Sequence, residues 1–131
     1  MTENDYISVR DVMTTDLQMM DGLATISEVL MMMRSENIGS VIIAKRDQQD
    51  EYGLVTVGDI ARNVISHNRA ADRVSAYEAM TKPILTLDPD MAIKYAVRLL
   101  NNLGVDTALV TDKRELMGIV TFKDMVLRHP V

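Results

Sequence analysis

The segment Gly53-Leu54-Val55-Thr56-Val57-Gly58-Asp59 returns later in the chain as Gly118-Ile119-Val120-Thr121-Phe122-Lys123-Asp124. Each copy ends an apolar run with a threonine, and an aspartate follows three residues later. A second motif is also repeated, because Met13-Thr14 returns as Met80-Thr81. Motifs that recur in the same order indicate an internal repeat, which constrains the architecture before single elements are assigned. The sequence therefore predicts two copies of one strand–Thr–x–x–Asp–helix unit.

Each repeat is expected to form a short strand, a helix, two paired strands and a second helix. Thr25 and Glu28 have the Thr-x-x-Glu spacing of a capping box, and a helical apolar stripe follows them. Gly39 and Gly104 fit the ends of the two longer helices. The strand–helix–strand order predicts a right-handed crossover between parallel strands. The expected strands are 17–20, 40–45, 52–57, 84–87, 107–111 and 116–121, and the expected last helices are 58–66 and 123–129.

Length and composition limit the class of protein. The chain has 131 residues, and a repeat of about 60 residues is marginally stable alone, so the two repeats are expected to pack together. A net charge of −5 argues against a nonspecific nucleic-acid binder, and the longest apolar run, 29–33, is too short to span a membrane. The absence of cysteine excludes disulfides and thiolate catalysis. Residues 1–5 are polar and unlike a signal peptide, so a cytoplasmic location is expected.

The repeated motifs resemble a tandem pair of CBS domains, often called a Bateman module. The resemblance rests on Val-Met-Thr and Ala-Met-Thr at the repeat starts, on Ile38-Gly39-Ser40-Val41 at the start of a strand, and on the two Gly-x-x-Thr-x-x-Asp segments. It implies an α/β fold of two pseudo-symmetric β-α-β-β-α repeats packed as one module. The implied organisation is an N-terminal tail at 1–6, CBS repeat 1 at 7–66, a linker at 67–73 and CBS repeat 2 at 74–130.

The resemblance also implies a function. CBS pairs typically bind adenosine-containing ligands in clefts between their repeats, so we expect a regulatory module that binds AMP, ADP, ATP or S-adenosylmethionine and modulates a partner protein. A homodimer is expected as well, without nucleic-acid or membrane partners, enzyme activity, a required cofactor or a metal. The sequence has no P-loop, and its acidic residues imply no acid–base pair. A ligand-free dimerisation or docking scaffold is the alternative.

The Thr-x-x-Asp segment suits a nucleotide on chemical grounds. A strand that turns into a helix directs backbone N–H groups toward one point, and a threonine hydroxyl adds another donor for phosphate. A carboxylate in the first helical turn can accept bonds from both hydroxyls of a ribose. The same spacing also serves plain helix capping, which stays open as the alternative. Thr56 and Thr121 are therefore candidate phosphate contacts, and Asp59 and Asp124 are candidate ribose contacts.

By family position, the base is expected between the first strand and the start of the second strand of each repeat. These regions are 14–18 with 38–40 and 81–85 with 105–107, where apolar walls suit a planar ring. The complete set of candidate ligand-binding residues is Thr14, Gln18, Ile38, Gly39, Ser40, Thr56, Asp59, Thr81, Leu85, Val105, Asp106, Thr107, Thr121, Lys123 and Asp124.

The two candidate sites differ in charge. Lys123 occupies the place of Gly58, so the second site is expected to prefer the more phosphorylated ligand, and Lys82 is expected near it. Asp106 would oppose that preference. Arg62 lies one turn into the helix of the first site. Plain solvated helix charges are the alternative for Arg62 and Lys123.

Two further features are interpreted as structural. The run Met31-Met32-Met33 indicates core and interface packing, because methionine is adaptable core filler. Apolar residues on more than one face of this helix indicate burial against a second chain around 29–33. His67 and His129 lack metal-ligand spacing, so surface or capping roles are expected for both.

Overall fold

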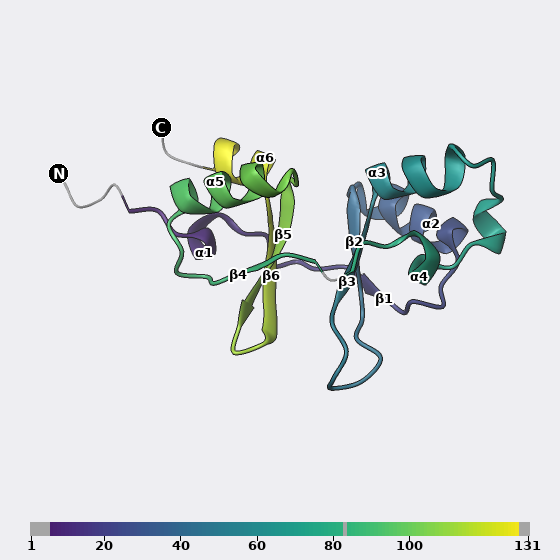
Figure 1. Cartoon of the computed structure of the whole chain (residues 1–131), viewed down its shortest axis with the longest axis horizontal. Coiled ribbons are helices and arrows are strands. Elements are labelled where there is room, and N and C mark those ends of the chain that lie inside the picture. Colours follow the sequence, from purple (N-terminus) through teal and green to yellow (C-terminus); the bar gives the residue numbers. More distant parts are fainter. Residues whose placement is uncertain (1–5, 83, 129–131) are drawn as a thin grey trace. The chain divides into compact units, whose positions relative to one another are not determined.

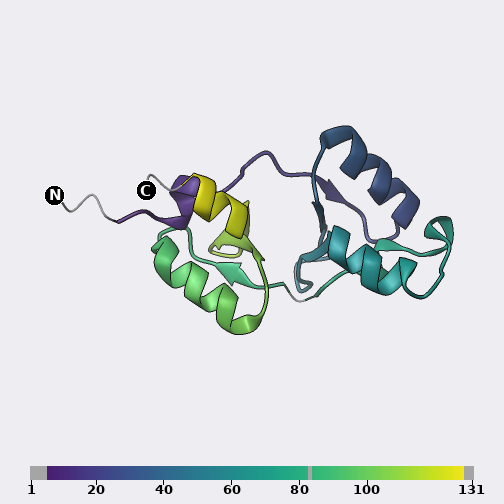
Figure 2. The same ribbon diagram turned by 90° about the horizontal axis from the view of Figure 1, so that it is seen from above.

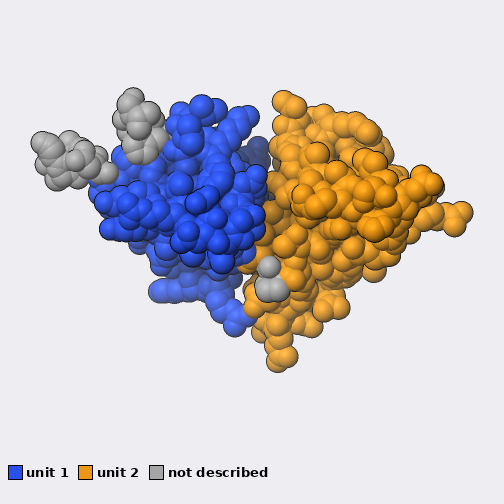
Figure 3. Space-filling model, turned by 45° about the horizontal axis from the view of Figure 1, so that its top comes forward, with its two compact units in different colours: residues 1–17, 85–131 blue, residues 18–84 orange. Residues whose placement is uncertain are grey.

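The computed structural model describes residues 6–82 and 84–128. The fold is α/β, as expected, with two three-stranded sheets and helices packed on them (Figure 1). The chain divides into two compact units, which Figure 3 colours separately. We call 18–84 the continuous unit, and we call 1–17 together with 85–131 the discontinuous unit. These units do not follow the sequence repeats, because the start of each repeat lies in the unit that contains the end of the other repeat.

The continuous unit contains one sheet, in which β1 (Met19–Met20), β2 (Ser40–Ile43) and β3 (Gly53–Thr56) are neighbours in that order. The helix α2 connects β1 to β2, which are parallel, and β2 pairs with β3 in antiparallel register. The helix α3 follows β3 directly and continues into a π-helical turn at Ala61–Ile65. The elements are Met19–Met20 (β1), Ile26–Glu36 (α2), Ser40–Ile43 (β2), Gly53–Thr56 (β3), Val57–Ile60 (α3), a 3-10 turn at Ala71–Arg73 and Ala76–Ala79 (α4).

The discontinuous unit repeats this arrangement with β4 (Thr86–Leu87), β5 (Thr107–Asp112) and β6 (Glu115–Thr121) as neighbours in that order. Strands β4 and β5 are parallel, and β5 and β6 are antiparallel with an irregularity between Val110 and Thr111. Figure 2 shows the helices of this unit from above. The elements are Val9–Val12 (α1), Thr86–Leu87 (β4), Ile93–Leu103 (α5), Thr107–Asp112 (β5), Glu115–Thr121 (β6) and Phe122–Leu127 (α6).

The helix termini follow local chemistry. The expected capping box of α2 is confirmed, because the Glu28 N–H donates to Thr25 Oγ1 at 3.2 Å and the Thr25 N–H donates to Glu28 Oε1 at 2.9 Å. Gly104 ends α5 in the left-handed region at φ 71°, also as expected. Gly39 does not end α2, however. Asn37 takes that place at φ 55°, a conformation that asparagine tolerates better than most residues with a side chain.

The remaining element boundaries differ only by a few residues from those expected. Strand β2 ends at Ile43 rather than at 45, because the polar hairpin loop begins earlier. The helix expected at 58–66 is present, but its second half is π-helical. The last helix was expected to reach His129, which lies outside the described residues, and α6 ends at Leu127.

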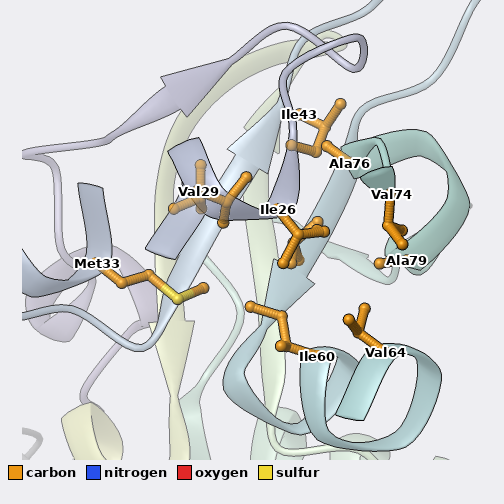
Figure 4. Close-up of a cluster of buried hydrophobic side chains, with 11 residues drawn as sticks. Ile26, Val29, Met33, Ile43, Ile60, Val64, Val74, Ala76 and Ala79 are labelled. Atoms are coloured by element: carbon orange, nitrogen blue, oxygen red, sulfur yellow. The ribbon is translucent and has the colours of Figure 1, made fainter. Parts of the chain in front are cut away.

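Each unit has its own hydrophobic core, and each core includes a short helix from the start of the other repeat. Figure 4 shows the core of the continuous unit, where Ala76 and Ala79 of α4 lie with Ile26 and Val29 of α2. In the discontinuous unit, α1 contributes buried valines to a core that is otherwise built from 85–125. Fully burying one valine side chain stabilises a fold by roughly 1.5–3 kcal/mol, so α1 is an integral part of its unit.

The methionine run is only partly buried. Met33 lies in the core and Met32 packs against it, which confirms the packing role for these two residues. Met31 is 67% exposed. No helix within 6–82 and 84–128 is long and apolar enough to cross a membrane.

Candidate functional site

The two Thr-x-x-Asp segments each form a corner between a strand and a helix. We call Thr56 with Asp59 the first corner and Thr121 with Asp124 the second corner. The first lies in the continuous unit and the second in the discontinuous unit. In each corner the threonine is the N-terminal cap of the helix and the aspartate is the third helical residue. The predicted capping geometry is therefore present twice.

A segment from the start of the other repeat lies beside each corner. We call these the lead segments. Segment 76–81 of repeat 2 lies beside the first corner, and segment 9–14 of repeat 1 lies beside the second. Thr81 pairs with Leu54 of β3 through two backbone hydrogen bonds of 2.8 and 3.1 Å. Thr14 pairs with Ile119 of β6 in the same way, at 2.8 and 3.0 Å. The sequence grouped Thr14 with the first site and Thr81 with the second, whereas the backbone pairs Thr81 with the strand of the first corner and Thr14 with the strand of the second.

Two glycines allow these close crossings. A Cβ atom on Gly118 would lie 2.8 Å from the carbonyl oxygen of Thr14 and 2.8 Å from the sulfur of Met13. A Cβ atom on Gly53 would lie 2.5 Å from the sulfur of Met80. At Gly118 the missing side chain leaves room for another backbone, and at Gly53 it leaves room for the Met80 side chain, so the glycine motif and the Met-Thr motif contact each other in both units. This contact explains why the two motifs are repeated together.

In the first corner both carboxylate oxygens of Asp59 are engaged. The Thr56 N–H donates to Oδ2 at 2.9 Å, and the Asp59 N–H donates back to Thr56 Oγ1 at 3.0 Å. The Thr81 hydroxyl donates to Oδ1 at 3.1 Å, and the Arg62 guanidinium donates to the same oxygen at 3.3 Å. The Asp59 side chain is only 6% exposed. A ligand at this oxygen must therefore compete with Thr81 and Arg62.

The second corner has a more accessible carboxylate. The Thr121 N–H donates to Asp124 Oδ2 at 3.1 Å, and the Asp124 N–H donates to Thr121 Oγ1 at 3.1 Å. The nearest cation to Oδ1 is Arg128, whose Nε lies 3.7 Å away. That guanidinium is anchored instead by the carbonyl oxygens of Val12 and Met13, at 3.2 and 3.1 Å. Asp124 therefore keeps an oxygen with room for a further donor.

The starts of the second strands lie beside the corners, as expected. The Val57 N–H donates to the Gly39 carbonyl at 3.0 Å, and Ser40 pairs with Thr56, so residues 38–40 adjoin the first corner. In the second corner the Phe122 N–H donates to the Asp106 carbonyl at 3.0 Å. The residues brought to that corner are Val105, Asp106 and Thr107, with Thr107 paired to Thr121.

The remaining candidates occupy the sheet edges and a helix surface. The Gln18 carbonyl accepts the Ile42 N–H at 3.0 Å, and the Leu85 carbonyl accepts the Leu109 N–H at 3.0 Å. Both residues therefore extend the parallel edge strand of their own unit. Lys123 is exposed on α6, and the carboxylate of Asp106 accepts a bond from the Thr107 hydroxyl at 3.0 Å.

An ionic cluster around the buried Asp50 was missed by the sequence analysis. Asp50, in the loop between β2 and β3, accepts bonds from the Lys82 ammonium and from Arg46, whose Nε lies at 3.1 Å. Both cations lie over the ring of Tyr77, at 5.6 and 5.2 Å. The Lys82 ammonium, helped by the Arg46 N–H, holds the pKa of Asp50 well below its usual range. Lys82 thus binds Asp50 within the continuous unit.

The sequence offered no local signal for this cluster, because Asp50 and Lys82 are far apart in the chain. Within 6–82 and 84–128, no group of three or more acidic, histidine or cysteine residues is arranged to hold a metal. His67 is exposed, as expected, and His129 lies outside the described residues.

Comparison with known proteins gives consistent matches. A protein of Methanopyrus kandleri is 31% identical over 125 residues, which cover 95% of this chain and 63% of that protein. The hexameric CBS-CP12 protein from bloom-forming cyanobacteria superposes with a TM-score of 0.90 at 26% identity, covering 95% of this chain and 72% of that one. The CBS domain pair of MJ0100, solved with 5′-methylthioadenosine and S-adenosyl-L-methionine, superposes with a TM-score of 0.80 at 22% identity, covering 94% and 95%.

The family model named CBS domain matches this chain twice, at residues 9–66 and 74–128. Each match contains one corner and one lead segment, so the motifs that first revealed the repeat lie inside the matched regions. The two matches together span most of the sequence. The chain therefore belongs to the CBS domain family and carries two CBS domains in tandem.

Proposed function

We propose that this chain is a regulatory module that binds an adenosine-containing ligand and holds its ribose at the corner carboxylates. CBS-domain proteins are typically regulatory rather than catalytic. The CBS pair of MJ0100, which shares the fold, was solved with two adenosine compounds. The candidate ligands for this chain are AMP, ADP, ATP and S-adenosylmethionine, and the ligand changes the affinity of the module for a partner protein.

This proposal rests on the hydrogen bonding of the Asp124 carboxylate. Its Oδ2 caps the helix through the Thr121 N–H, while the nearest cation to Oδ1 among residues 6–82 and 84–128 is Arg128, at 3.7 Å. A carboxylate oxygen has two lone pairs, so Oδ1 can accept bonds from the hydroxyls of a ribose without breaking the cap. We assign the phosphate side of the same ligand to the hydroxyl of Thr121 and to Lys123, which is exposed on α6.

Isothermal titration calorimetry with AMP tests the proposal directly. Replacing Asp124→Ala should weaken AMP binding by about 1.5–3 kcal/mol, the range for hydrogen bonds to charged groups. The 2′-deoxy and 3′-deoxy forms should lose a similar amount with the unchanged protein. Asp112→Ala is the matched control, because Asp112 is an exposed carboxylate in the same unit and outside the corner.

The double variant Asp59→Ala with Asp124→Ala separates the ribose contact from other modes of binding. If this variant binds AMP as tightly as the unchanged protein, the carboxylates do not hold the ribose and the proposal fails. Circular dichroism of each variant checks that the corner substitutions leave the fold intact, since both aspartates also cap helices.

A second candidate function is a ligand-free docking or dimerisation scaffold, which the exposed apolar side chains favour. Leu127 and Val126 on α6 are 70% and 62% exposed, and Ile65 is 70% exposed. Thermal unfolding with a panel of adenosine compounds distinguishes the two functions. A ligand at 100 times its dissociation constant stabilises the native state by about 2.7 kcal/mol, whereas a ligand-free scaffold shows no shift with any compound.

A further inference from the structure

We propose that Arg62 closes the first corner to adenosine compounds that carry no anionic group, such as adenosine itself, and that Gly58 leaves room for this closure. The inference rests on the proposed function, because it concerns which adenosine compound the first corner accepts. It assigns a specificity-determining role to an arginine that the sequence alone leaves open to interpretation as a solvated helix charge.

The closure is a direct contact with the oxygen that a ribose needs. Arg62 Nη2 lies 3.3 Å from Oδ1 of Asp59, whose other oxygen caps the helix. The Arg62 side chain is 70% exposed, while that of Asp59 is 6% exposed. The guanidinium therefore covers the carboxylate from the solvent side. A ribose that binds Oδ1 must therefore compete with Arg62, as it must with the hydroxyl of Thr81 at 3.1 Å.

The position of the guanidinium depends on the missing side chain of Gly58. A Cβ atom at that residue would lie 2.9 Å from Nη1 and 3.1 Å from Nη2 of Arg62, closer than real Cβ atoms tolerate without a shift. Arg62 thus lies back across the first turn of the helix, over the α-carbon of Gly58. A side chain at 58 would therefore require the guanidinium to shift from this position.

The second corner has neither the glycine nor the arginine of this arrangement. In the aligned repeat, Lys123 stands in place of Gly58 and Leu127 stands in place of Arg62. The nearby Arg128 is tied to the carbonyl oxygens of Val12 and Met13 and stays 3.7 Å from Asp124 Oδ1. The two corners therefore differ in access to the carboxylate, although their capping bonds are alike.

The released arginine gives the first corner its selectivity. When Arg62 leaves Asp59 it loses a charge-assisted hydrogen bond, which disfavours binding of any ligand. A phosphate offers the guanidinium a bidentate partner in exchange, whereas adenosine has no anionic group and offers none. Because the arginine remains tethered one turn from the corner, the exchange favours phosphate-bearing adenosine compounds.

Calorimetry with adenosine and with AMP tests this inference in a protein that carries Asp124→Ala, so that the second corner does not contribute. Arg62→Ala should tighten adenosine binding about threefold to fivefold, the range for removing an exposed ion pair, and should leave AMP binding unchanged or weaker. Gly58→Ala should displace the guanidinium but keep its charge, so both ligands should bind more tightly and AMP at least as much as adenosine. Arg69→Ala is the matched control, because Arg69 pairs with Glu78 in the same unit.

A second measurement uses the unchanged protein and needs no corner variant. The side-chain NMR signal of Arg62, assigned by its loss in Arg62→Ala, should shift on addition of AMP to a different position from that on addition of adenosine. Identical shifts with both ligands would show that the guanidinium does not contact phosphate.

The possible outcomes separate this inference from the proposed function. Equal gains for adenosine and AMP in Arg62→Ala, or no gain for either, overturn the role of Arg62 as a phosphate-selective closure. If the unchanged protein binds AMP and the single variant Asp124→Ala does not, the proposed function stands even when the role of Arg62 has failed. If no adenosine compound binds any variant, both proposals fall together.

Discussion

The backbone of Thr14 exchanges two hydrogen bonds with that of Ile119, at 2.8 and 3.0 Å, although the two residues belong to different repeats. The contact is possible because Gly118, next to Ile119, has no side chain. Thr81 and Leu54 repeat the arrangement in the continuous unit. The two lead segments are therefore structural parts of the units that they join, and their contacts can be tested one by one.

Gly118→Ala should destabilise the protein by about 1–3 kcal/mol, the usual cost of overpacking. The added Cβ would meet a backbone oxygen, that of Thr14, at 2.8 Å, so no side-chain rotation relieves the clash. Urea unfolding followed by circular dichroism measures the loss. Gly39→Ala is the control, because its Cβ would lie 3.8 Å from the nearest atom, on Val57. Equal unfolding midpoints for the two variants would contradict the close crossing.

Asp50→Asn should destabilise the protein at neutral pH, and the difference from the unchanged protein should shrink in acid. The pKa of Asp50 is lowered in the folded state by Lys82 and the Arg46 N–H, so the unfolded chain takes up a proton first as the pH falls. The stabilisation is thus fully present above about pH 4, the ordinary value for aspartate, and declines below it. Urea titrations at pH 7, 5, 4 and 3 follow this change.

Asp47→Asn is the matched variant for this experiment, because Asp47 lies in the same loop and its carboxylate accepts a bond from the Gln49 N–H at 2.9 Å. Its effect should be smaller at neutral pH. A difference for Asp50→Asn that stays constant from pH 7 to pH 3 would show that the ionised carboxylate does not stabilise the fold.

Lys123→Ala should weaken ATP binding more than adenosine binding, and Asp106→Ala should strengthen ATP binding. The expectation follows from charge, since a lysine 4 Å from a phosphate gains roughly 1 kcal/mol in water and a carboxylate loses a similar amount. Calorimetry with both ligands on each variant measures the difference. Equal losses for adenosine and ATP in Lys123→Ala would exclude phosphate as the partner of this lysine.

Met31→Glu should weaken a homodimer formed through α2. Met31 is 67% exposed and lies with Glu28, Met32 and Ser35 around a shallow cavity of about 370 Å³ on that helix. Light scattering at tens of micromolar, roughly the range in which a weak interface forms, should give a dimer mass for the unchanged protein and a lower mass for the variant. Gln49→Glu adds the same charge in the hairpin loop and should leave the mass unchanged. A monomer for the unchanged protein would refute the dimer.

The elements of the fold could be predicted because they depend on neighbours in the sequence. The cap at Thr25, the left-handed Gly104 and the strand–Thr–x–x–Asp corners all rest on residues within four positions of one another. The error at Gly39 arose from the same local logic, since Asn37 reached the left-handed region two residues earlier. Local spacing predicts that a helix ends, but it predicts the last residue less well.

The composition of the site could not be predicted in the same way. The exchange of lead segments pairs residues of different repeats, and no periodicity within a repeat records such a partner. The signal in the sequence for this exchange was the repetition of Gly53 and Met80 as Gly118 and Met13. Its meaning follows from the contact between each glycine and its methionine, which the structure shows. Arg62 is a similar case, because its three-residue spacing from Asp59 is also common on solvated helices.

The exchange of lead segments has a consequence for how such a protein can arise. In both units the Met-Thr segment lies against the strand of the other repeat, so a polypeptide with a single repeat would take this segment from a second molecule. The earliest form would then be a swapped pair of identical chains, which is a low-cost route to a dimer. Fusion of the two copies makes the exchange intramolecular and independent of protein concentration. After fusion, the two halves are free to diverge, as Gly58 and Lys123 have done.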